Sequence, residues 1–330
     1  MVWFGIAASA CAIDVNENQL ESEVADATCP RFGCGTNTAF GPDGLVFDEF
    51  DWSGKQGNEG GAHLGAARIG AIPVAVSAER DRLVAHDALG NRYSEMALVG
   101  MIIDVPVDGK PGVEIQVANV MVNGVQFWGG DTTQVAVYYD LKARYVGEAK
   151  FTHQICNNHA LTSEPWGTAP AYSALIFEGD RYDAENKLVI PSAGENWLNI
   201  ACAGSYPAKM HLLRHTAAGE QVPTTAQMRT TMLKALTADY FGDGRSFTIT
   251  GQPLRYSDAA SIKVESPLPF GPGLTIPEAL WNEHGIVCLD EPRVYPRNKI
   301  DPDNVIPHCS IADWQDHGYV VTGTPVWLWF

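Results

Sequence analysis

Short runs of β-branched and aromatic residues, separated by turn-forming residues, dominate the chain between Ala71 and Phe151. One run, from Val113 to Val117, alternates strictly between apolar and polar residues, which places its apolar side chains on one face of a strand. Strands are expected at Ile72–Val76, Met96–Val107, Val113–Val122 and Thr133–Leu141. The pattern predicts a β-rich sandwich or jelly roll over residues 29–151. Within it, the Gly-, Asp- and Asn-rich stretch Gly41–Gly70 is expected to be a long surface loop.

The pattern becomes mixed in residues 152–330. Buried strands are expected at Ala174–Phe177 and Trp197–Ile200, and further strand-like segments at Ser246–Thr250 and Ile286–Leu289. Three helices are expected at Ala208–His215, Ala226–Tyr240 and Ile276–Glu283. The second has apolar residues four apart and a threonine cap, and the other two have a proline in their first turn. The chain is therefore predicted to be α+β, either as two regions or as one continuous domain.

The first 28 residues have a different character. Met1–Ala10 is apolar or small, and Ala8-Ser9-Ala10-Cys11 resembles the lipobox of a bacterial lipoprotein signal without its basic start. Ala12–Thr28 carries five acidic residues and no basic one, as a solvated tether would. We expect a truncated lipoprotein-like signal with Cys11 as the lipidated residue. The alternative is an apolar segment that packs against the protein.

The cysteine count agrees with export. Without Cys11 the chain has an even six, which suits oxidation in pairs: Cys29, Cys34, Cys156, Cys202, Cys288 and Cys309. The short spacing of Cys29 and Cys34 favours a bond between them. The other four are expected to form two bridges, or one bridge and two thiols. No two cysteines have the C-x-x-C spacing of a redox centre or zinc ribbon.

Charge and hydropathy narrow the possible partners. The formal net charge of −17 repels nucleic acid and anionic lipid headgroups. No apolar run approaches the roughly 20 residues that span a bilayer. We expect no nucleic-acid partner, contact with a membrane through a lipid anchor only, and an unidentified ligand or cell-envelope partner.

Five separated segments stand out together: Thr28–Asn37, Ala174–Asp183, Trp197–Gly204, Ala208–Thr216 and Leu236–Tyr240. In this order they resemble one family, the bacterial ADYC-domain proteins. The resemblance implies an exported protein, often with a lipoprotein-type start, and implies no reaction. The chain departs from the family's Ala-Asp-Tyr-Cys signature at Phe241. If the missing cysteine is normally bridged, its former partner here should be an unpaired thiol.

Four residues are candidates for chemistry. His211 and His215 are four apart on the expected helix, which would place both imidazoles on one face, as zinc ligands require. The H-E-x-x-H glutamate is absent, which excludes a metalloprotease site, and another kind of metal site would need His284, His308 or Asp239 as a third ligand. Because paired histidines on one helix face more often bond to neighbouring backbone or stay exposed, we expect no metal and no other cofactor. Cys202 precedes that helix and could serve as a thiolate nucleophile with His215 as base and Asp239 to orient it. The competing interpretation makes Cys202 half of a disulfide.

The turn after the first buried strand of the second half is also rich in charge. Glu178, Asp180, Arg181 and Asp183 could form an acid/base pair or a calcium site, or simply stabilise a hairpin. From all these features we expect an exported cell-envelope lipoprotein that acts as a binding or structural module. Its expected location is the outer membrane or another membrane of the cell envelope, or else the periplasm or the extracellular space. The alternative is an exported hydrolase centred on Cys202, His211, His215 and Asp239.

The lipid anchor gives the first testable prediction. Expressed from a start codon upstream that adds a basic segment, the protein should be processed at Cys11 in a globomycin-sensitive step. Mass spectrometry of the mature N-terminus should then find a lipid on Cys11. A mature protein that begins at Met1 without lipid would contradict this.

Overall fold

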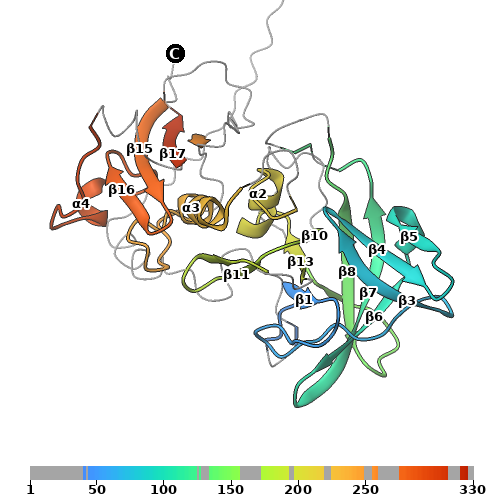
Figure 1. Ribbon diagram of the computed structural model, residues 1–330. Coiled ribbons are helices and arrows are strands. Elements are labelled where there is room, and N and C mark those ends of the chain that lie inside the picture. Colours follow the sequence, from blue (N-terminus) through green and yellow to red (C-terminus); the bar gives the residue numbers. More distant parts are fainter. Residues whose placement is uncertain are drawn as a thin grey trace, which may run out of the picture.

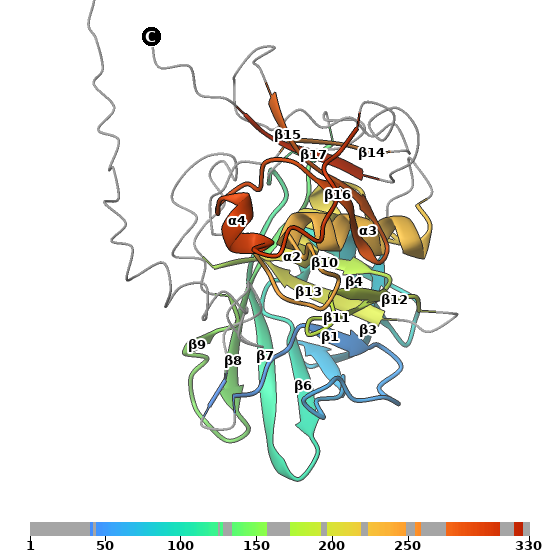
Figure 2. The same ribbon diagram turned by 90° about the vertical axis from the view of Figure 1, so that its left-hand side faces the viewer.

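The computed structural model describes residues 40–41, 44–124, 126–127, 134–156, 172–192, 197–218, 224–248, 255–258, 275–310 and 320–325. Cys11, Cys29 and Cys34 lie outside these residues, as does the whole lipoprotein-like start, residues 1–28. The described chain is strand-rich, with a large antiparallel sheet at one end and a smaller sheet at the other (Figure 1). Helices α2 (Tyr206–Leu212) and α3 (Ala226–Thr237) lie between the two sheets (Figures 1 and 2).

The large sheet has eleven strands among the described residues, in the order β1-β13-β10-β8-β7-β6-β2-β3-β4-β5, with β9 beside β8. Its strands are β1 (Glu49–Asp51), β2 (Ala67–Ile69), β3 (Ile72–Glu79), β4 (Arg82–Asp87), β5 (Arg92–Ser94), β6 (Ile102–Val107), β7 (Lys110–Met121), β8 (Tyr138–Tyr145), β9 (His153–Gln154), β10 (Ser173–Glu178) and β13 (Trp197–Cys202). A short 3₁₀ helix, η1 (Glu95–Leu98), precedes β6. The sheet curls back on itself, so that the Glu178 N–H donates to the Arg80 carbonyl at 2.7 Å.

Strands β10 and β13 come after residue 151 and pair with strands on both sides of it. The expected division at that residue therefore runs through one sheet. Alternate residues of β10 face opposite cores: Ala174 and Ile176 belong to the core inside the curled sheet, and Leu175 and Phe177 to a smaller core under α2. This double burial explains why the segment is an unbroken apolar run.

The second, four-stranded sheet has the order β14-β17-β15-β16. Its strands are β14 (Arg255–Asp258), β15 (Thr275–Asn282), β16 (Gly285–Leu289) and β17 (Val320–Pro325), and the short α4 (Arg297–Ile300) follows β16. Helix α3 packs on this sheet and shares a core with it that includes Met232, Leu233 and Trp281. A separate hairpin, β11 (Arg181–Asp183) and β12 (Leu188–Ile190), lies beside α3.

Several expected elements are confirmed. Helix α3 begins at Ala226 with Thr225 as its cap, whose Oγ1 accepts from the Met228 N–H at 3.2 Å. The strands expected at Ile72–Val76, Val113–Val122, Ala174–Phe177, Trp197–Ile200 and Ile286–Leu289 are present with shifted ends. The fold is β-rich with three described helices, in agreement with the expected class.

The helix expected at Ile276–Glu283 is wrong, because this segment is strand β15. Ala279 and Trp281 lie in the core shared with α3, and Glu278, at a register shift between β15 and β17, is buried in an ion pair with Arg293. Pro277 stands next to a register shift between β15 and β17, a place where a strand tolerates a residue without an N–H. Hydrogen bonding of this segment to β16 and β17 therefore outweighs the local preference of Pro277 for the first turn of a helix.

Two other expectations also need correction. Gly41–Gly70 is not only a surface loop, since it contains β1 and β2 and its Phe47 and Phe50 are fully buried. The run from Met96 begins with the 3₁₀ helix η1 rather than a strand. The expected strand at Ser246–Thr250 is not present in residues 246–248, the part of it that the structure describes.

The structure contains disulfides Cys156–Cys202 and Cys288–Cys309. The first ties the chain after β9 to the end of β13, and the second ties β16 to the segment after α4. Of the two outcomes left open for these four cysteines, two bridges is the one found. None of the four is therefore the unpaired thiol that Phe241 led us to expect.

These bonds should differ in their contribution to stability. They join residues separated by 46 and 21 positions, so loop-closure entropy predicts losses of about 4 kcal/mol for Cys156→Ala/Cys202→Ala and about 3 kcal/mol for Cys288→Ala/Cys309→Ala. Urea denaturation of both double variants and the parent would measure this. Unchanged stability in the first variant would show that its bond does not form in solution.

Candidate functional site

Cys202 is not available as a nucleophile in this structure. It is bonded to Cys156, and both residues are buried within the core of the large sheet. A thiolate is required for nucleophilic attack, and a disulfide sulfur has no proton to lose. The competing expectation, that Cys202 is half of a disulfide, is the one that the structure contains.

His211 packs between aromatic rings rather than facing a cleft. Its ring stacks on Phe177 with centroids 4.3 Å apart and meets Phe127 edge-on at 5.3 Å. Its Nδ1 lies 3.3 Å from the Thr216 hydroxyl. Burial lowers the pKa of His211 to about 3, and the nearby Arg214 cation adds to this shift. The imidazole is therefore neutral at physiological pH and serves as a core residue.

His215 does not share a helix face with His211. Helix α2 ends at Leu212, and Arg214 has a left-handed backbone with φ of 65° that turns the chain before His215. His215 is fully buried, and its ring lies 6.3 Å from that of Tyr256 in an edge-on arrangement. The two imidazoles are therefore not side by side on one helix face, although the histidines are four apart in sequence. Among the described residues, no three His, Cys, Asp or Glu side chains gather as a metal site would require.

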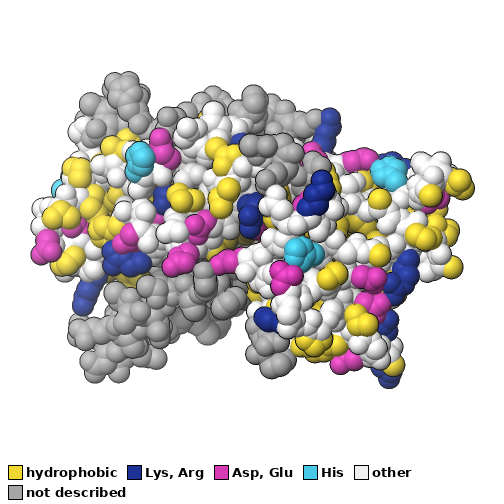
Figure 3. Space-filling view, turned by 60° about the horizontal axis from the view of Figure 1, so that its bottom comes forward, with side chains coloured by type: hydrophobic (Ala, Val, Ile, Leu, Met, Phe, Trp, Pro, Cys, Tyr) yellow, Lys and Arg dark blue, Asp and Glu magenta, His cyan; other side chains and the backbone are white. Residues whose placement is uncertain are grey.

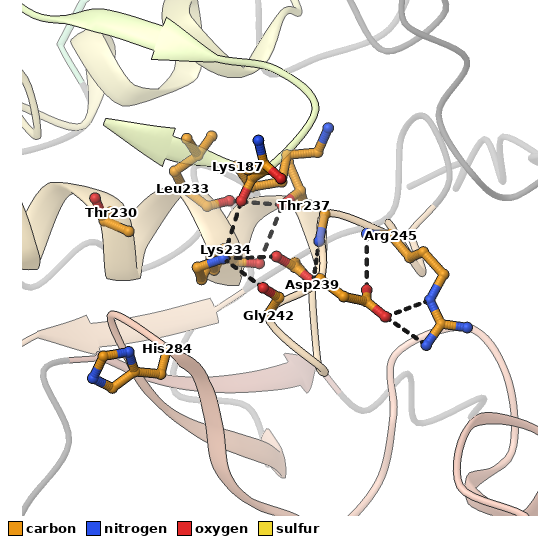
Figure 4. Close-up of polar contacts among 12 residues, drawn as sticks. Lys187, Thr230, Leu233, Lys234, Thr237, Asp239, Gly242, Arg245 and His284 are labelled. Atoms are coloured by element: carbon orange, nitrogen blue, oxygen red, sulfur yellow. Dashed lines mark hydrogen bonds and ion pairs between the residues drawn. The ribbon is translucent and has the colours of Figure 1, made fainter. Parts of the chain in front are cut away.

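Asp239 belongs to a buried ion pair at the end of α3 (Figure 4). Its Oδ2 lies 2.9 Å from the Lys234 Nζ, and its Oδ1 accepts from the Gly244 N–H at 3.2 Å. Lys234 also donates to the Asn186 carbonyl at 3.2 Å, which ties α3 to the turn between β11 and β12. The carboxylate suggested as an orienting group therefore holds a helix end in place.

The residues on either side of Asp239 contribute to the same helix end. Ala238 ends α3 in the left-handed conformation, with φ of 52°, and is fully buried, so a larger side chain would not fit there. Gly242 follows with φ of 69°, and a Cβ at this position would lie 1.8 Å from the His284 carbonyl oxygen. The signature segment is thus a helix stop packed against the turn between β15 and β16.

Tyr240 joins a second buried network. Its hydroxyl donates to Glu278 Oε1 at 2.6 Å, and Arg293 contacts both oxygens of the same carboxylate at 2.7 and 2.9 Å. Arg293 also donates to the Ala235 carbonyl at 2.8 Å, at the last turn of α3. The network connects the helix end, β15 and the segment after β16.

The charged turn after β10 consists of ion pairs and a turn cap. Asp180 pairs with Arg229 of α3, with Nε and Oδ2 2.5 Å apart, and Arg181 pairs with Glu49 of β1 at 2.7 Å. Asp183 Oδ1 accepts two backbone N–H groups of the following turn, at 2.9 and 3.0 Å. Each charge has a structural partner, in agreement with the hairpin interpretation of this turn.

One cleft lies beside that turn, with a volume of about 220 Å³. It is lined by β1 and the chain before it, by the loop around Asn58, by the β11–β12 turn, by the end of β13 and by the start of α2. Its ionisable side chains are five carboxylates and one lysine: Asp48, Glu49, Glu59, Asp183, Glu185 and Lys110. Figure 3 shows acidic side chains across the middle of the face that comes forward from the bottom of Figure 1. The cleft is strongly negative for its size.

Two tyrosines line the same cleft. The rings of Tyr182 and Tyr206 meet edge-on with centroids 5.9 Å apart. Burial raises the pKa of both hydroxyls, and nearby carboxylates, including Glu49, act in the same direction. The Tyr182 hydroxyl oxygen is buried without a hydrogen-bond partner among the residues that the structure describes.

The sequence did not predict this cleft. Asp48 and Glu49 lie in the stretch that was expected to be a surface loop, and Tyr206 precedes the helix expected at Ala208–His215. Asp183 was considered only as part of the charged turn. The available signal was the resemblance itself, since two of the five family-like segments, Ala174–Asp183 and Trp197–Gly204, contain residues that line the cleft. A third, Ala208–Thr216, begins directly after the lining residue Pro207.

Comparison with known proteins gives a family but no relative of known activity. The ADYC domain family matches residues 95–295, which is more than half of the chain. The match extends from η1 across most of the large sheet to the segment after β16. No curated protein and no solved structure matches the chain. Within the described residues, no helix is both long and apolar enough to cross a bilayer.

The Tyr240 network should be costly to break. In Arg293→Met the buried Glu278 carboxylate loses its ion pair, which should lower stability by about 3 to 5 kcal/mol. Tyr240→Phe removes one neutral donor and should cost about 1 to 2 kcal/mol. Chemical denaturation would measure both, with Arg92→Met as the control, because the Arg92–Glu79 pair is half exposed and should contribute at most about 1 kcal/mol. A loss in Arg293→Met no larger than in this control would contradict the assignment.

The low pKa of His211 predicts a dependence of stability on pH. The unfolded chain binds a proton near pH 6.5 and the native state only near 3, so stability falls as the pH decreases from about 6.5 towards 3. Between pH 6.5 and 4.5 this histidine should account for a loss of about 2 to 3 kcal/mol. His211→Phe should remove that part of the slope, whereas the exposed control His308→Gln should keep it. Parallel slopes in all three proteins would contradict the prediction.

Proposed function

The chain belongs to the ADYC-domain family, and we propose that this member is an exported cell-envelope lipoprotein that acts as a binding module, with the acidic cleft as its binding site. The lipobox-like segment ending at Cys11 and the acidic tether after it support the envelope location. Two disulfides in the described body suit an oxidising compartment, where such bonds persist. The net charge of −17 disfavours nucleic acid as the ligand.

The observation that carries the binding role is the cleft itself. Concave sites lined by apolar surface and a few polar groups are the usual places where proteins bind small ligands. Here the walls combine the tyrosine rings with Asn199 and the carboxylates of β1 and the β11–β12 turn. The residues suggested for hydrolysis are instead used in a disulfide, an aromatic stack and an ion pair. A binding role therefore fits this arrangement better than the hydrolase alternative.

Blocking the cleft tests the proposal. Ala184 and Pro207 line it from different segments and are partly exposed, so Ala184→Trp and Pro207→Trp should fill it from two sides. The matched control is Ala88→Trp, at an exposed turn of the large sheet. Each purified protein, with its melting temperature verified, would be incubated with a small-molecule extract of the cell envelope, separated by gel filtration and analysed by mass spectrometry.

We expect the parent and Ala88→Trp to retain a compound that both blocked variants lose. Equal retention by all four proteins would show that binding occurs elsewhere. A thiol titration under denaturing conditions should find no thiol at Cys202. A free Cys202 together with hydrolytic turnover would favour the hydrolase instead.

A further inference from the structure

We infer that the ligand group held in the acidic cleft is a cation of about the size of one amino-acid side chain, a guanidinium or an alkylammonium. This inference rests on the proposed binding role of the cleft and specifies its ligand. Such a group occurs as an arginine or lysine side chain of a partner protein and as a free polyamine. Three features of the cleft lead to it: its charge, its aromatic rings and its size.

The charge of the lining selects a cation. Five carboxylates face one lysine, so the ionisable groups sum to four negative charges. Glu49 is almost fully buried, and its burial raises the pKa of the carboxyl although the Arg181 cation opposes this. A carboxylate in such a place gains from a second nearby cation, because its own solvation is poor. An anionic ligand would meet repulsion from both sides of the cleft.

The tyrosines give the cation a second kind of contact. Aromatic faces attract guanidinium and ammonium groups within about 6 Å. Tyr206 is only 8% exposed, and Asp48, Glu49 and Asp183 act electrostatically on its hydroxyl. Tyr182 also lines the cleft, and its ring meets that of Tyr206 edge-on, so the two rings form one aromatic pair in the wall.

The protein already holds one guanidinium next to the cleft in the same manner. Arg181 pairs with Glu49 and lies over the Trp197 ring, with its Cζ 4.2 Å from the ring centroid. This arrangement combines one carboxylate and one aromatic ring. The cleft offers the same two components, carboxylates beside a pair of rings.

Size and geometry argue for an organic cation rather than a metal. The cleft volume of about 220 Å³ is smaller than the roughly 300 Å³ of the smallest sites for drug-sized ligands. A ligand group of the size of one amino-acid side chain would therefore fit it. A metal ion needs several ligands directed at one point. No three acidic, histidine or cysteine side chains of the described residues are arranged in that way. The negative charge is spread along the walls, as suits an extended cation.

The test compares an arginine and a citrulline compound, which differ in charge at nearly constant shape, and adds agmatine, which carries two positive charges. N-acetylarginine methylamide mimics a protein side chain, agmatine represents a free polyamine, and N-acetylcitrulline methylamide is the neutral isostere of the first. Titrations followed by NMR at low salt should show the two cations binding roughly tenfold more tightly than the citrulline compound. Tighter binding of the arginine compound would identify a protein segment as the source, and tighter binding of agmatine a free amine.

Variants locate the effect in the cleft. Asp48→Asn/Glu185→Gln removes two negative charges with little change of shape and should weaken binding of the cations roughly tenfold. Glu291→Gln/Asp303→Asn removes the same charge from exposed positions outside the cleft and should leave binding unchanged. Tyr206→Phe should retain affinity because it keeps the ring, whereas Tyr206→Leu should lose it roughly threefold or more.

Equal affinity for the citrulline and arginine compounds, or no binding of any of the three at millimolar concentration, would overturn the inference about charge. The proposed binding role would survive either result if the blocked variants still lost a compound from the envelope extract. Equal weakening by both double variants would also overturn it, because the effect would then come from overall charge and not from the cleft.

Discussion

Strands β10 and β13 have both faces buried, and much of the architecture follows from the need to cover them. One face closes the core of the curled sheet, and the other requires α2, whose Ala208 and Leu212 pack on Leu175 and Phe177. His211 completes that cover by stacking on Phe177, which is why an imidazole is kept there in its neutral form. The cleft lies where β1, β13 and the start of α2 meet, so its position is a consequence of the same packing.

The end of α3 shows how buried charge specifies a structure. Three buried ion pairs lie in or beside α3 among the described residues: Arg229–Asp180, Lys234–Asp239 and Arg293–Glu278. The first ties α3 to the turn after β10, the second closes the helix end, and Arg293 of the third also donates to the Ala235 carbonyl in the last turn of α3. Buried pairs of this kind give little net stability, because desolvation offsets much of their attraction. Their effect is to penalise alternatives, since any other packing would leave a charge buried alone. The contacts of Asp239 and Tyr240 thus give the Ala-Asp-Tyr part of the family signature a role in folding.

The sequence predicted best the elements whose signals are local. Helix α3 has apolar residues four apart after a threonine cap, and Ala174–Phe177 is an apolar run long enough for a doubly buried strand. The prediction failed where contacts with residues distant in sequence determine the secondary structure or the position of a site. Pro277 led us to predict a helix from local sequence, but its segment pairs with β16 and β17 as a strand. The cleft was missed for the same reason, since Asp48, Asp183 and Tyr206 come from segments that only the folded chain brings together.

The carboxylates of the acidic cleft favour binding of a cation but lower the stability of the folded protein without a ligand. Burial raises the pKa of Glu49, and the nearby Glu59 carboxylate acts in the same direction, so a negative charge on Glu49 stands where solvation is poor and where another carboxylate repels it. Arg181 relieves part of this cost at Glu49. A bound cation would relieve more of it, and because only the folded state has the cleft, the binding free energy would add to the free energy of unfolding. The charge that is unfavourable in the empty protein is therefore the same charge that would make a cation bind.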